Sequence, residues 1–240
     1  MLEVVSLTRR FPDAEKPALD GVSFSVPDGN FLVVAGSNGS GKSVLMGLIA
    51  GLDTPTAGSV RSLPGRVGLV FQDADAQILG DTPEEDVAFG PKGLRLRPDE
   101  VTRRVEKSLA RVGLSEKRQH PARSLSGGEK RRLAVAGILA IDAELIIFDE
   151  PYAGLDWPGV LQVNEILGSL KADGKTIIVL THELEKVLAL ADRLLVLDSG
   201  RLVFDGNPSA ALESAPLADW GIRHPLVSYR GVSDLVWEAR

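Results

Sequence analysis

The stretch Gly36-Ser37-Asn38-Gly39-Ser40-Gly41-Lys42-Ser43 decides the fold of this chain. The apolar run Phe31-Leu32-Val33-Val34-Ala35 precedes it and is typical of a short buried strand. After it, Leu45 and Leu48 lie among apolar residues that recur at helical spacing. Strand, glycine-rich loop and helix, in this order, form the context in which G-x-x-x-x-G-K-[ST] predicts a phosphate-binding loop.

Each residue type in this stretch suits a polyphosphate. The glycines leave no Cβ in the way, so backbone N–H groups can turn inward around phosphate oxygens, and the positive end of the helix dipole faces the same anion. Lys42 would place its charge on the β- and γ-phosphates, and the Ser43 hydroxyl can bind Mg²⁺. The alternative is a glycine-rich turn that opens a helix and binds nothing. The expected nucleotide-binding residues are Gly36, Ser37, Asn38, Gly39, Ser40, Gly41, Lys42, Ser43 and Val44.

The composition limits the function classes. With 240 residues, the chain can form one domain or two small lobes, and its net charge of −6 argues against a basic nucleic-acid-binding face. The absence of cysteine rules out disulfides and thiol chemistry. We find no signal-peptide pattern after Met1 and no apolar run close to the roughly 20 residues that a membrane crossing needs. We therefore expect a soluble intracellular protein whose membrane role, if it has one, comes through a partner.

Apolar periodicity predicts strands that alternate with helices, which is typical of an α/β fold with a mainly parallel sheet. Residues 53–58 are expected to form a loop, and residues 72–93 a shaped loop with at most a short helix. The mostly helical stretch 72–135 would be a lobe inserted into this fold. The expected strands are 2–8, 22–35, 67–71, 145–148, 176–180, 194–197 and 202–204, the last two as a hairpin. The expected helices cover 98–112, a segment from about 128, 158–171 and 183–191.

A second candidate site follows the predicted strand 145–148, where Asp149 and Glu150 end an apolar run. Acids at this position lie at the carboxyl edge of the sheet, where α/β folds bind ligands. Asp149 can hold Mg²⁺ beside the phosphates, and Glu150 is placed to orient and deprotonate an attacking water. Taken alone, two acids after a strand are also a common strand ending.

A third candidate site is Leu125-Ser126-Gly127-Gly128-Glu129. Ser126 and Glu129 form S-x-x-E, which is a capping box for the helix that follows. A cap needs neither Gly127 nor Gly128, whereas a backbone that closes on a phosphate needs both. Both interpretations can hold at once.

In this order and spacing, the three sites resemble those of ATP-binding-cassette (ABC) ATPases, and Glu129 departs from the L-S-G-G-Q signature of that family. The resemblance covers residues 2–212 and implies a P-loop NTPase fold of the ABC type. It implies a RecA-like core, an N-terminal antiparallel β subdomain and an inserted helical subdomain. The predicted ATPase domain is then 1–212, with its core at 1–71 and 136–212 and the helical lobe at about 72–135, followed by a tail at 213–240.

Four further positions match the family. Gln72 lies where the family has a glutamine that contacts Mg²⁺ and the attacking water, and His182 matches the histidine that hydrogen-bonds the γ-phosphate. Gly154-Leu155-Asp156 resembles the loop that touches the opposite subunit, and Phe11 resembles the aromatic residue that stacks on adenine. Each of these alone is more typical of a surface or core residue.

The resemblance also implies that one chain cannot complete the site. ATP would lie between the 36–43 loop of one subunit and the 126–129 segment of the other, in a head-to-tail dimer. The residues expected to act across this interface are Ser126, Gly127, Gly128, Glu129 and Asp156. The dimer would be a homodimer or a heterodimer with a paralogous ATPase.

The segment from Phe71 to Pro91 is similar to its counterpart in energy-coupling-factor ATPases, which power the uptake of vitamins and of cobalt or nickel ions. Ala74 replaces the usual proline there, and Pro83 replaces the usual valine. In that group the region receives a helix of the transmembrane partner, so we expect docking near residues 73–91 at the cytoplasmic face of the cell membrane.

Two other classes compete with this interpretation: the ATPase subunit of another ABC importer or exporter, and a non-transport ABC protein that acts on nucleic acid or ribosomes. The second is disfavoured because residues 44–124 carry no sustained heptads and only one phosphate loop is present. A P-loop kinase would not need Ser126-Gly127-Gly128. In the tail, Trp220, Leu235 and Trp237 predict a short packed segment at a subunit contact.

Overall fold

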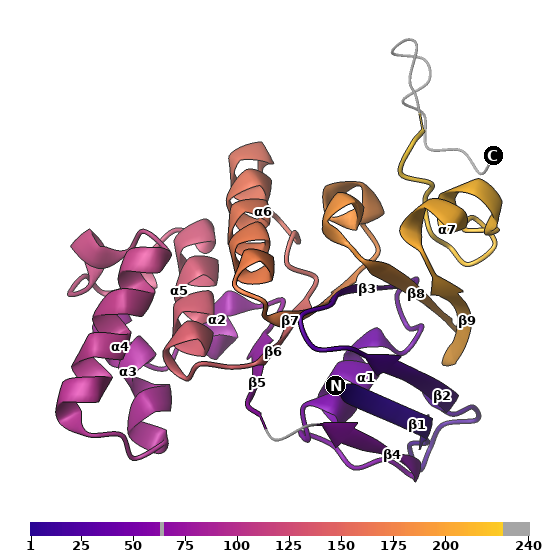
Figure 1. Cartoon of the computed structure of the whole chain (residues 1–240), viewed down its shortest axis with the longest axis horizontal. Helices are drawn as coiled ribbons and strands as arrows, with labels where there is room; N and C mark the ends of the chain where they lie inside the picture. Colours follow the sequence, from indigo (N-terminus) through magenta and orange to yellow (C-terminus); the bar gives the residue numbers. More distant parts are fainter. Residues whose placement is uncertain (63–64, 228–240) are drawn as a thin grey trace.

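The computed structural model describes residues 1–62 and 65–227. It has two sheets (Figure 1). The smaller is antiparallel, with the order β2-β1-β4, and it consists of β1 (Leu2–Arg9), β2 (Leu19–Val26) and β4 (Ala57–Ser62). The larger has the order β5-β6-β7-β3-β8-β9 and is parallel except for β9. Its strands are β3 (Phe31–Ala35), β5 (Val67–Val70), β6 (Leu145–Asp149), β7 (Thr176–Thr181), β8 (Arg193–Asp198) and β9 (Arg201–Gly206).

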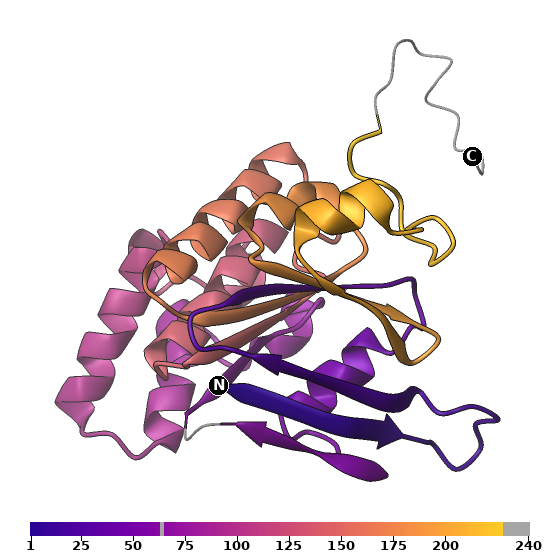
Figure 2. The ribbon, with the colours of Figure 1, turned by 45° about the vertical axis from the view of Figure 1, so that its right-hand side comes forward.

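Helices cover both faces of the large sheet. The α-helices are α1 (Lys42–Ile49), α2 (Ala74–Gln77), α3 (Pro83–Gly93), α4 (Pro98–Arg111), α5 (Gly127–Ala140), α6 (Trp157–Ala172) and α7 (Pro208–Ser214). Figure 2 shows α1 between the two sheets and α5 and α6 on the opposite face of the large sheet. Helices α3, α4 and α5 pack together beyond β5. In the described part of the chain, none of the helices combines the length and the apolar character that a membrane crossing requires.

Strand β3 explains how the large sheet serves two cores. All five of its residues are buried. Val33 belongs to the core that α5 and α6 cover, whereas Leu32 and Val34 belong to the core shared with α1 and the small sheet. Successive side chains of a strand point to opposite faces, so a strand buried on both faces must be apolar throughout. The predicted α/β fold of the ABC type is confirmed, including the N-terminal antiparallel sheet. The division into domains stays a prediction.

Three local predictions are wrong. Residues 22–35 are not one strand, because a turn at 27–30, with Gly29 at φ +74°, separates β2 from β3 and sends them into different sheets. Residues 57 and 58, expected in a loop, begin β4. Residues 183–191 form two short 3₁₀ helices, Leu184–Lys186 and Leu188–Leu190, rather than one α-helix.

The loop predicted for residues 72–93 contains the 11-residue helix α3. Its start signals are complete: the Thr82 hydroxyl caps Glu85 N, Pro83 takes the first position, and Glu84, Glu85 and Asp86 fill the first turn. The structure describes only part of the segment that is predicted to pack as a tail. Trp220 packs against the main core, and Leu235 and Trp237 lie outside the described residues.

Candidate functional site

The loop between β3 and α1 holds its shape because of glycine. Gly41 has φ +106°, and a Cβ there would lie 2.6 Å from Ala18 O and 2.8 Å from Leu19 Cδ2. No side chain caps the N-terminus of α1. The first N–H groups of a helix have no partner within the helix, and they are available to an anion when no side chain takes them.

Lys42 lies inside this loop, with its side chain 6% exposed. Its Nζ donates to Gly36 O at 2.7 Å and to Ser37 O at 3.1 Å, and it lies 3.7 Å from Glu150 Oε1. Burial lowers the pKa of Lys42, and the charges of Glu150 and Asp149 partly offset this effect. The ammonium group is thus fixed by the loop at the position where phosphates are expected.

Asp149 ends β6 beside the start of α1. The Ser43 hydroxyl donates to Asp149 Oδ2 at 3.2 Å, whereas Oδ1 is buried and has no hydrogen-bond partner among the residues that the structure describes. Burial raises the pKa of Asp149, because taking a carboxylate out of water disfavours its charged form. A buried carboxylate oxygen without a partner is unusual, and it marks a position that suits a cation.

Glu150 is held in a strained backbone conformation with φ +44°. Its Oε2 accepts from Thr181 Oγ1 at 3.0 Å, and its Oε1 lies 3.0 Å from His182 Nδ1. A carboxylate oxygen only accepts, so the imidazole proton lies on Nδ1. Strand pairing explains why Glu150 lies beside Thr181 and His182. Strands β6 and β7 are neighbours, and Asp149 is in register with Leu180. No sequence pattern indicated Thr181, although it directly precedes His182 at the same strand end.

Two predicted residues lie outside this cluster of contacts. Gln72 follows β5 and is exposed, and its carbonyl oxygen accepts a hydrogen bond from Arg131 Nη2 at 3.2 Å. The Phe11 ring is exposed, and the Arg9 guanidinium lies 4.7 Å from its centroid. Phe11 therefore makes a cation–π contact with Arg9 while part of the residue stays open to solvent.

The Ser-Gly-Gly segment begins α5 with a complete capping box. Ser126 Oγ accepts from Glu129 N at 3.3 Å, and Glu129 Oε2 accepts from Ser126 N at 2.9 Å. Hydrogen bonds from Lys117 and from Ser126 N lower the pKa of Glu129 to about 2. Outside the neighbouring residues and backbone of α5 itself, a Cβ on Gly127 or Gly128 would meet no atom of the described residues within 4 Å. The fold of a single chain therefore gives no packing reason for either glycine.

Figure 1 places α5 in the helical group with α3 and α4, whereas α1 lies near the small sheet. Asp156 caps α6, where its Oδ1 accepts from Gly159 N at 3.0 Å. Within one chain, the structure thus brings Lys42, Ser43, Asp149, Glu150 and His182 together and leaves Ser126 and Asp156 as helix caps elsewhere.

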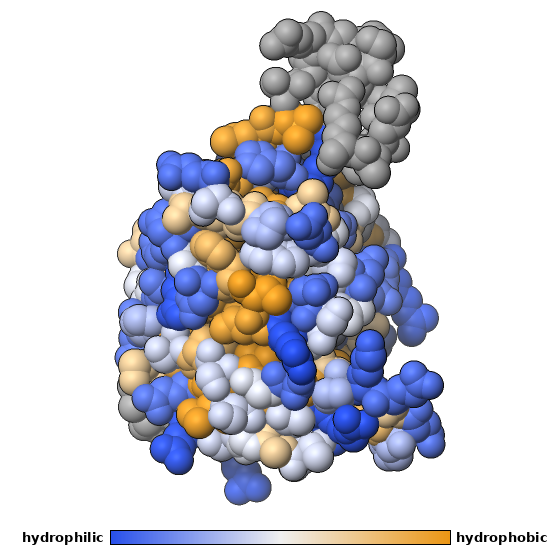
Figure 3. Space-filling view, turned by 90° about the vertical axis from the view of Figure 1, so that its right-hand side faces the viewer, coloured by the Kyte–Doolittle hydropathy of each residue, from blue (hydrophilic) through white to orange (hydrophobic). Residues whose placement is uncertain are grey.

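A contact that the sequence analysis missed joins the C-terminal segment to the phosphate loop. Gly221 has φ +69°, and a Cβ there would lie 3.1 Å from Ser37 Cβ. The buried side chains of Leu217 and Ile222 anchor this turn in the main core. Figure 3 shows the face that carries β9 and α7, where hydrophilic residues surround a band of hydrophobic ones.

The comparisons with known proteins agree with this geometry. Residues 19–153 match the family described as ABC transporter. The chain is 40% identical over 238 residues to the energy-coupling factor transporter ATP-binding protein EcfA of Carboxydothermus hydrogenoformans, covering 94% of this chain and 88% of that protein. It is 42% identical over 242 residues to the cobalt import ATP-binding protein CbiO of Rhodobacter capsulatus, covering 95% of this chain and 86% of that protein.

Two solved structures have the same fold. One is cbiO1 from Clostridium perfringens, described as part of the ABC transporter complex cbiONQ, with a TM-score of 0.79, 30% identity and coverage of 93% of this chain and 95% of that chain. The other is a dimeric post-hydrolysis state of the ATP-binding cassette MJ0796 bound to ADP and Pi, with a TM-score of 0.76, 27% identity and coverage of 87% and 99%. The predicted resemblance to energy-coupling-factor ATPases is confirmed. The chain therefore belongs to the ABC transporter family, as an ATPase of that family.

Proposed function

We propose that this ATPase closes around ATP as a head-to-tail dimer and thereby drives the uptake of a micronutrient, a vitamin or a cobalt or nickel ion. It would do so at the cytoplasmic face of the cell membrane, together with membrane subunits of the energy-coupling-factor type. The observation that carries the proposal is the cluster of Lys42, Asp149, Glu150 and His182 at one edge of the sheet. The names of its relatives support the transport role.

Glu150 is the general base in this proposal. Thr181 and His182 fix its two oxygens, so the carboxylate presents its remaining lone pairs in a set orientation to a water. His182 Nδ1 is engaged with Glu150, and Nε2 of a neutral ring only accepts. To donate to a phosphate oxygen, His182 must therefore gain a second proton or leave Glu150. We infer that nucleotide binding rearranges this pair.

The residues around Asp149 fit Mg²⁺. A carboxylate and a hydroxyl oxygen are donors that this ion prefers, and Asp149 Oδ1 is buried without another partner. The described residues hold no group of three or more His, Cys, Asp or Glu side chains that would form an all-protein metal site. Mg²⁺ commonly takes one or two carboxylates together with substrate phosphates and water. Bound here, the ion would neutralise phosphate charge, with Ser43 and Asp149 as its ligands and Gln72 as a further candidate.

We expect Asp149→Asn to raise the melting temperature of the nucleotide-free protein by about 2 °C at neutral pH. Burial raises the pKa of Asp149, so its ionised form costs stability above that pKa, whereas asparagine never ionises. The gain should shrink as the pH falls, because wild-type Asp149 then becomes protonated. Stabilisation by Mg²⁺ and ATP should be lost in the same variant. Thermal melts at neutral and acidic pH, with and without Mg²⁺ and ATP, test both expectations.

The proposed dimer depends on the start of α5, where a single chain leaves space beside the two glycines. A Cβ on Gly127 or Gly128 would have free space around it among the described residues, and the N-terminus of α5 offers a second set of N–H donors for a γ-phosphate. The dimeric MJ0796 structure supports such an assembly. The second subunit would be a second copy of this chain or a paralogous ATPase.

We expect Ser126→Arg to lower ATPase activity at least roughly a hundredfold, because a large cation in the predicted site keeps that site from closing around ATP. ATP binding by the monomer should stay within about twofold of wild type, since the phosphate loop is untouched. Ser126→Ala is the matched control, because it removes the same helix cap without adding bulk. Activity and ATP-induced dimer formation report the outcome. Equal losses in both variants would mean that Ser126 is only a cap.

Residues 73–91 carry the proposed docking surface for the membrane subunits. Leu79 and Phe89 are 68% and 63% exposed there. Large apolar side chains that gather on a surface mark a site of interaction with another protein. We expect Phe89→Asp to abolish co-purification with membrane subunits and to leave the ATPase activity of the purified chain within about twofold. Leu52→Asp is a matched control, because Leu52 is 64% exposed and lies outside this surface. Retained co-purification of Phe89→Asp would place the docking surface elsewhere.

A further inference from the structure

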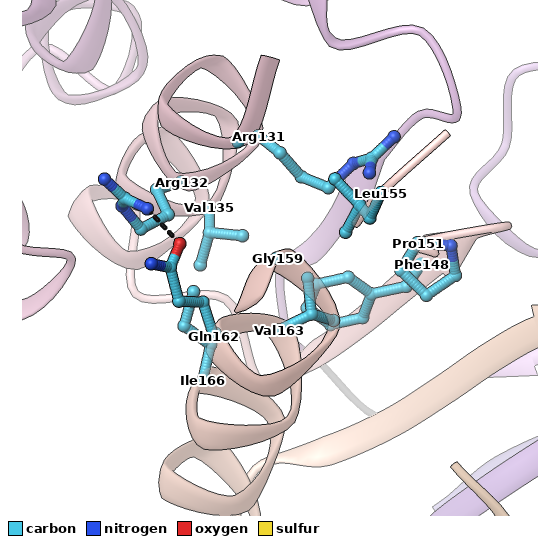
Figure 4. Close-up of a pocket in the computed structure, with 11 residues that line it drawn as sticks. Arg131, Arg132, Val135, Phe148, Pro151, Leu155, Gly159, Gln162, Val163 and Ile166 are labelled. Atoms are coloured by element: carbon cyan, nitrogen blue, oxygen red, sulfur yellow. Dashed lines mark hydrogen bonds between the residues drawn. The ribbon is translucent and has the colours of Figure 1, made fainter. Parts of the chain in front are cut away.

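Arg131 is a buried cation in the second turn of α5, and it is 9% exposed. Its Nη1 and Nη2 donate to Ala153 O at 3.3 and 3.2 Å, and Nη2 also donates to Gln72 O at 3.2 Å. Figure 4 shows this side chain leaving α5 toward Leu155, on the far side of the pocket between α5 and α6. One guanidinium therefore joins three segments that are far apart in the sequence.

No carboxylate offsets this buried charge among the residues that the structure describes. Burial alone lowers the pKa of Arg131, and its Nε is buried without a hydrogen-bond partner. Burying a cation without a counter-ion destabilises a fold, and an apolar side chain of similar length at such a position is often neutral or stabilising. Folding alone therefore gives no reason for an arginine here.

The three segments that Arg131 joins carry the predicted machinery of the ATPase. Helix α5 begins with Ser126 and the two glycines. Gln72 follows β5, and Ala153 lies between Glu150 and Asp156, with Ala153 N donating to Glu150 O at 3.1 Å. The planar fork of an arginine can hold two carbonyls at a fixed separation, which the single point of a lysine ammonium does less well.

The packing around Arg131 is tight enough to transmit a displacement. The cavity between α5 and α6 measures about 10 Å³, roughly the space of one water. Phe148, Val163 and Leu155 contribute to its lining. Close-packed interiors shift as units rather than deform continuously, so a movement of α5 would reach the two carbonyls through Arg131.

We propose that Arg131 is a positioning residue of the ATPase: it holds the segments that carry Gln72, Glu150 and Asp156 in a fixed arrangement relative to the start of α5. When α5 moves as the dimer closes, these segments move with it. The proposal rests on the proposed function. In the described part of the chain, the hydrogen bonds of Arg131 go to Ala153 and Gln72 rather than to the phosphate loop, so we expect its effect on the hydrolysis step and not on ATP affinity.

The test compares Arg131→Met, Arg131→Lys and wild type in the full chain. We expect Arg131→Met to lower kcat at least roughly tenfold, with the Kd for ATP within about twofold and the melting temperature equal to or above that of wild type. Arg131→Lys should restore part of kcat, because it keeps the charge but not the fork. Arg104→Met is the matched control, because Arg104 also donates to a main-chain carbonyl, Ala140 O, at 3.1 Å on a neighbouring helix.

Two outcomes would overturn the proposal: an unchanged kcat in Arg131→Met, or a loss of kcat that follows a lowered melting temperature and appears equally in Arg104→Met. Failure of the proposed dimer is distinguishable, because the activity of the wild-type chain per molecule would then be independent of protein concentration.

Discussion

Glu150→Gln is expected to lower kcat for ATP hydrolysis by roughly 10²–10⁴-fold, the usual contribution of a general base. The amide cannot accept the proton of the attacking water. It retains an oxygen that can accept from Thr181 or His182, so the geometry of the site should persist. Because the phosphate loop is intact, ATP should still bind, and the ATP-bound dimer should accumulate.

Single-turnover hydrolysis and size-exclusion chromatography with ATP measure these two effects of Glu150→Gln. Glu165→Gln on the exposed face of α6 is the control for the loss of a carboxylate, and it should behave as wild type. Normal turnover in Glu150→Gln would refute the role of Glu150 as the base. Weak ATP binding in that variant would instead indicate that Glu150 acts mainly through its 3.7 Å approach to Lys42.

The second large effect is expected from Lys42→Ala, which should weaken ATP binding by roughly 30- to 300-fold. A charge-assisted hydrogen bond contributes about 1.5–3 kcal/mol, and Lys42 can give more than one to the β- and γ-phosphates. The buried position strengthens these contacts, because little water screens them. The nucleotide-free fold should lose little stability, since burial already disfavours the charged lysine.

Equilibrium binding of ATP to Lys42→Ala, with thermal melting of the nucleotide-free protein, checks this expectation. Lys175→Ala is the control, because Lys175 pairs with Asp142 at the surface, away from the phosphate loop. An affinity within about twofold of wild type in Lys42→Ala would mean that the loop holds its anion through backbone N–H groups alone.

The phosphate loop and the two acids could be predicted from sequence because their chemistry is local. Each is a short pattern that follows a buried strand, and the strand fixes where the pattern lies. The pairing of β6 with β7 then explains why His182 meets Glu150, a contact that the sequence did not indicate. The family resemblance implies only a hydrogen bond from His182 to the γ-phosphate.

The errors and omissions come from contacts that no local pattern encodes. The turn at 27–30 lies inside a run that is otherwise apolar and strand-like, so two strands of different sheets were predicted as one. Three contacts join distant parts of the chain. Thr181 donates a hydrogen bond to Glu150, and Gly221 lies close to Ser37. Arg131 donates hydrogen bonds to the carbonyl oxygens of Gln72 and Ala153. The roles of all the candidate site residues stay predictions, because each requires a nucleotide, a metal ion or a second subunit.

Mixing the Lys42→Ala variant with the Ser126→Arg variant tests most directly whether one ATP is bound between two subunits. At ATP concentrations near the Kd of the wild type, each variant alone should show almost no activity. In a mixed head-to-tail dimer, the intact phosphate loop of the Ser126→Arg subunit faces the intact Ser-Gly-Gly segment of the Lys42→Ala subunit, which completes one site. An equal mixture should therefore recover up to roughly a quarter of wild-type activity if subunits pair at random. A mixture that stays as inactive as its components, while wild-type activity per molecule is independent of protein concentration, would contradict the shared site.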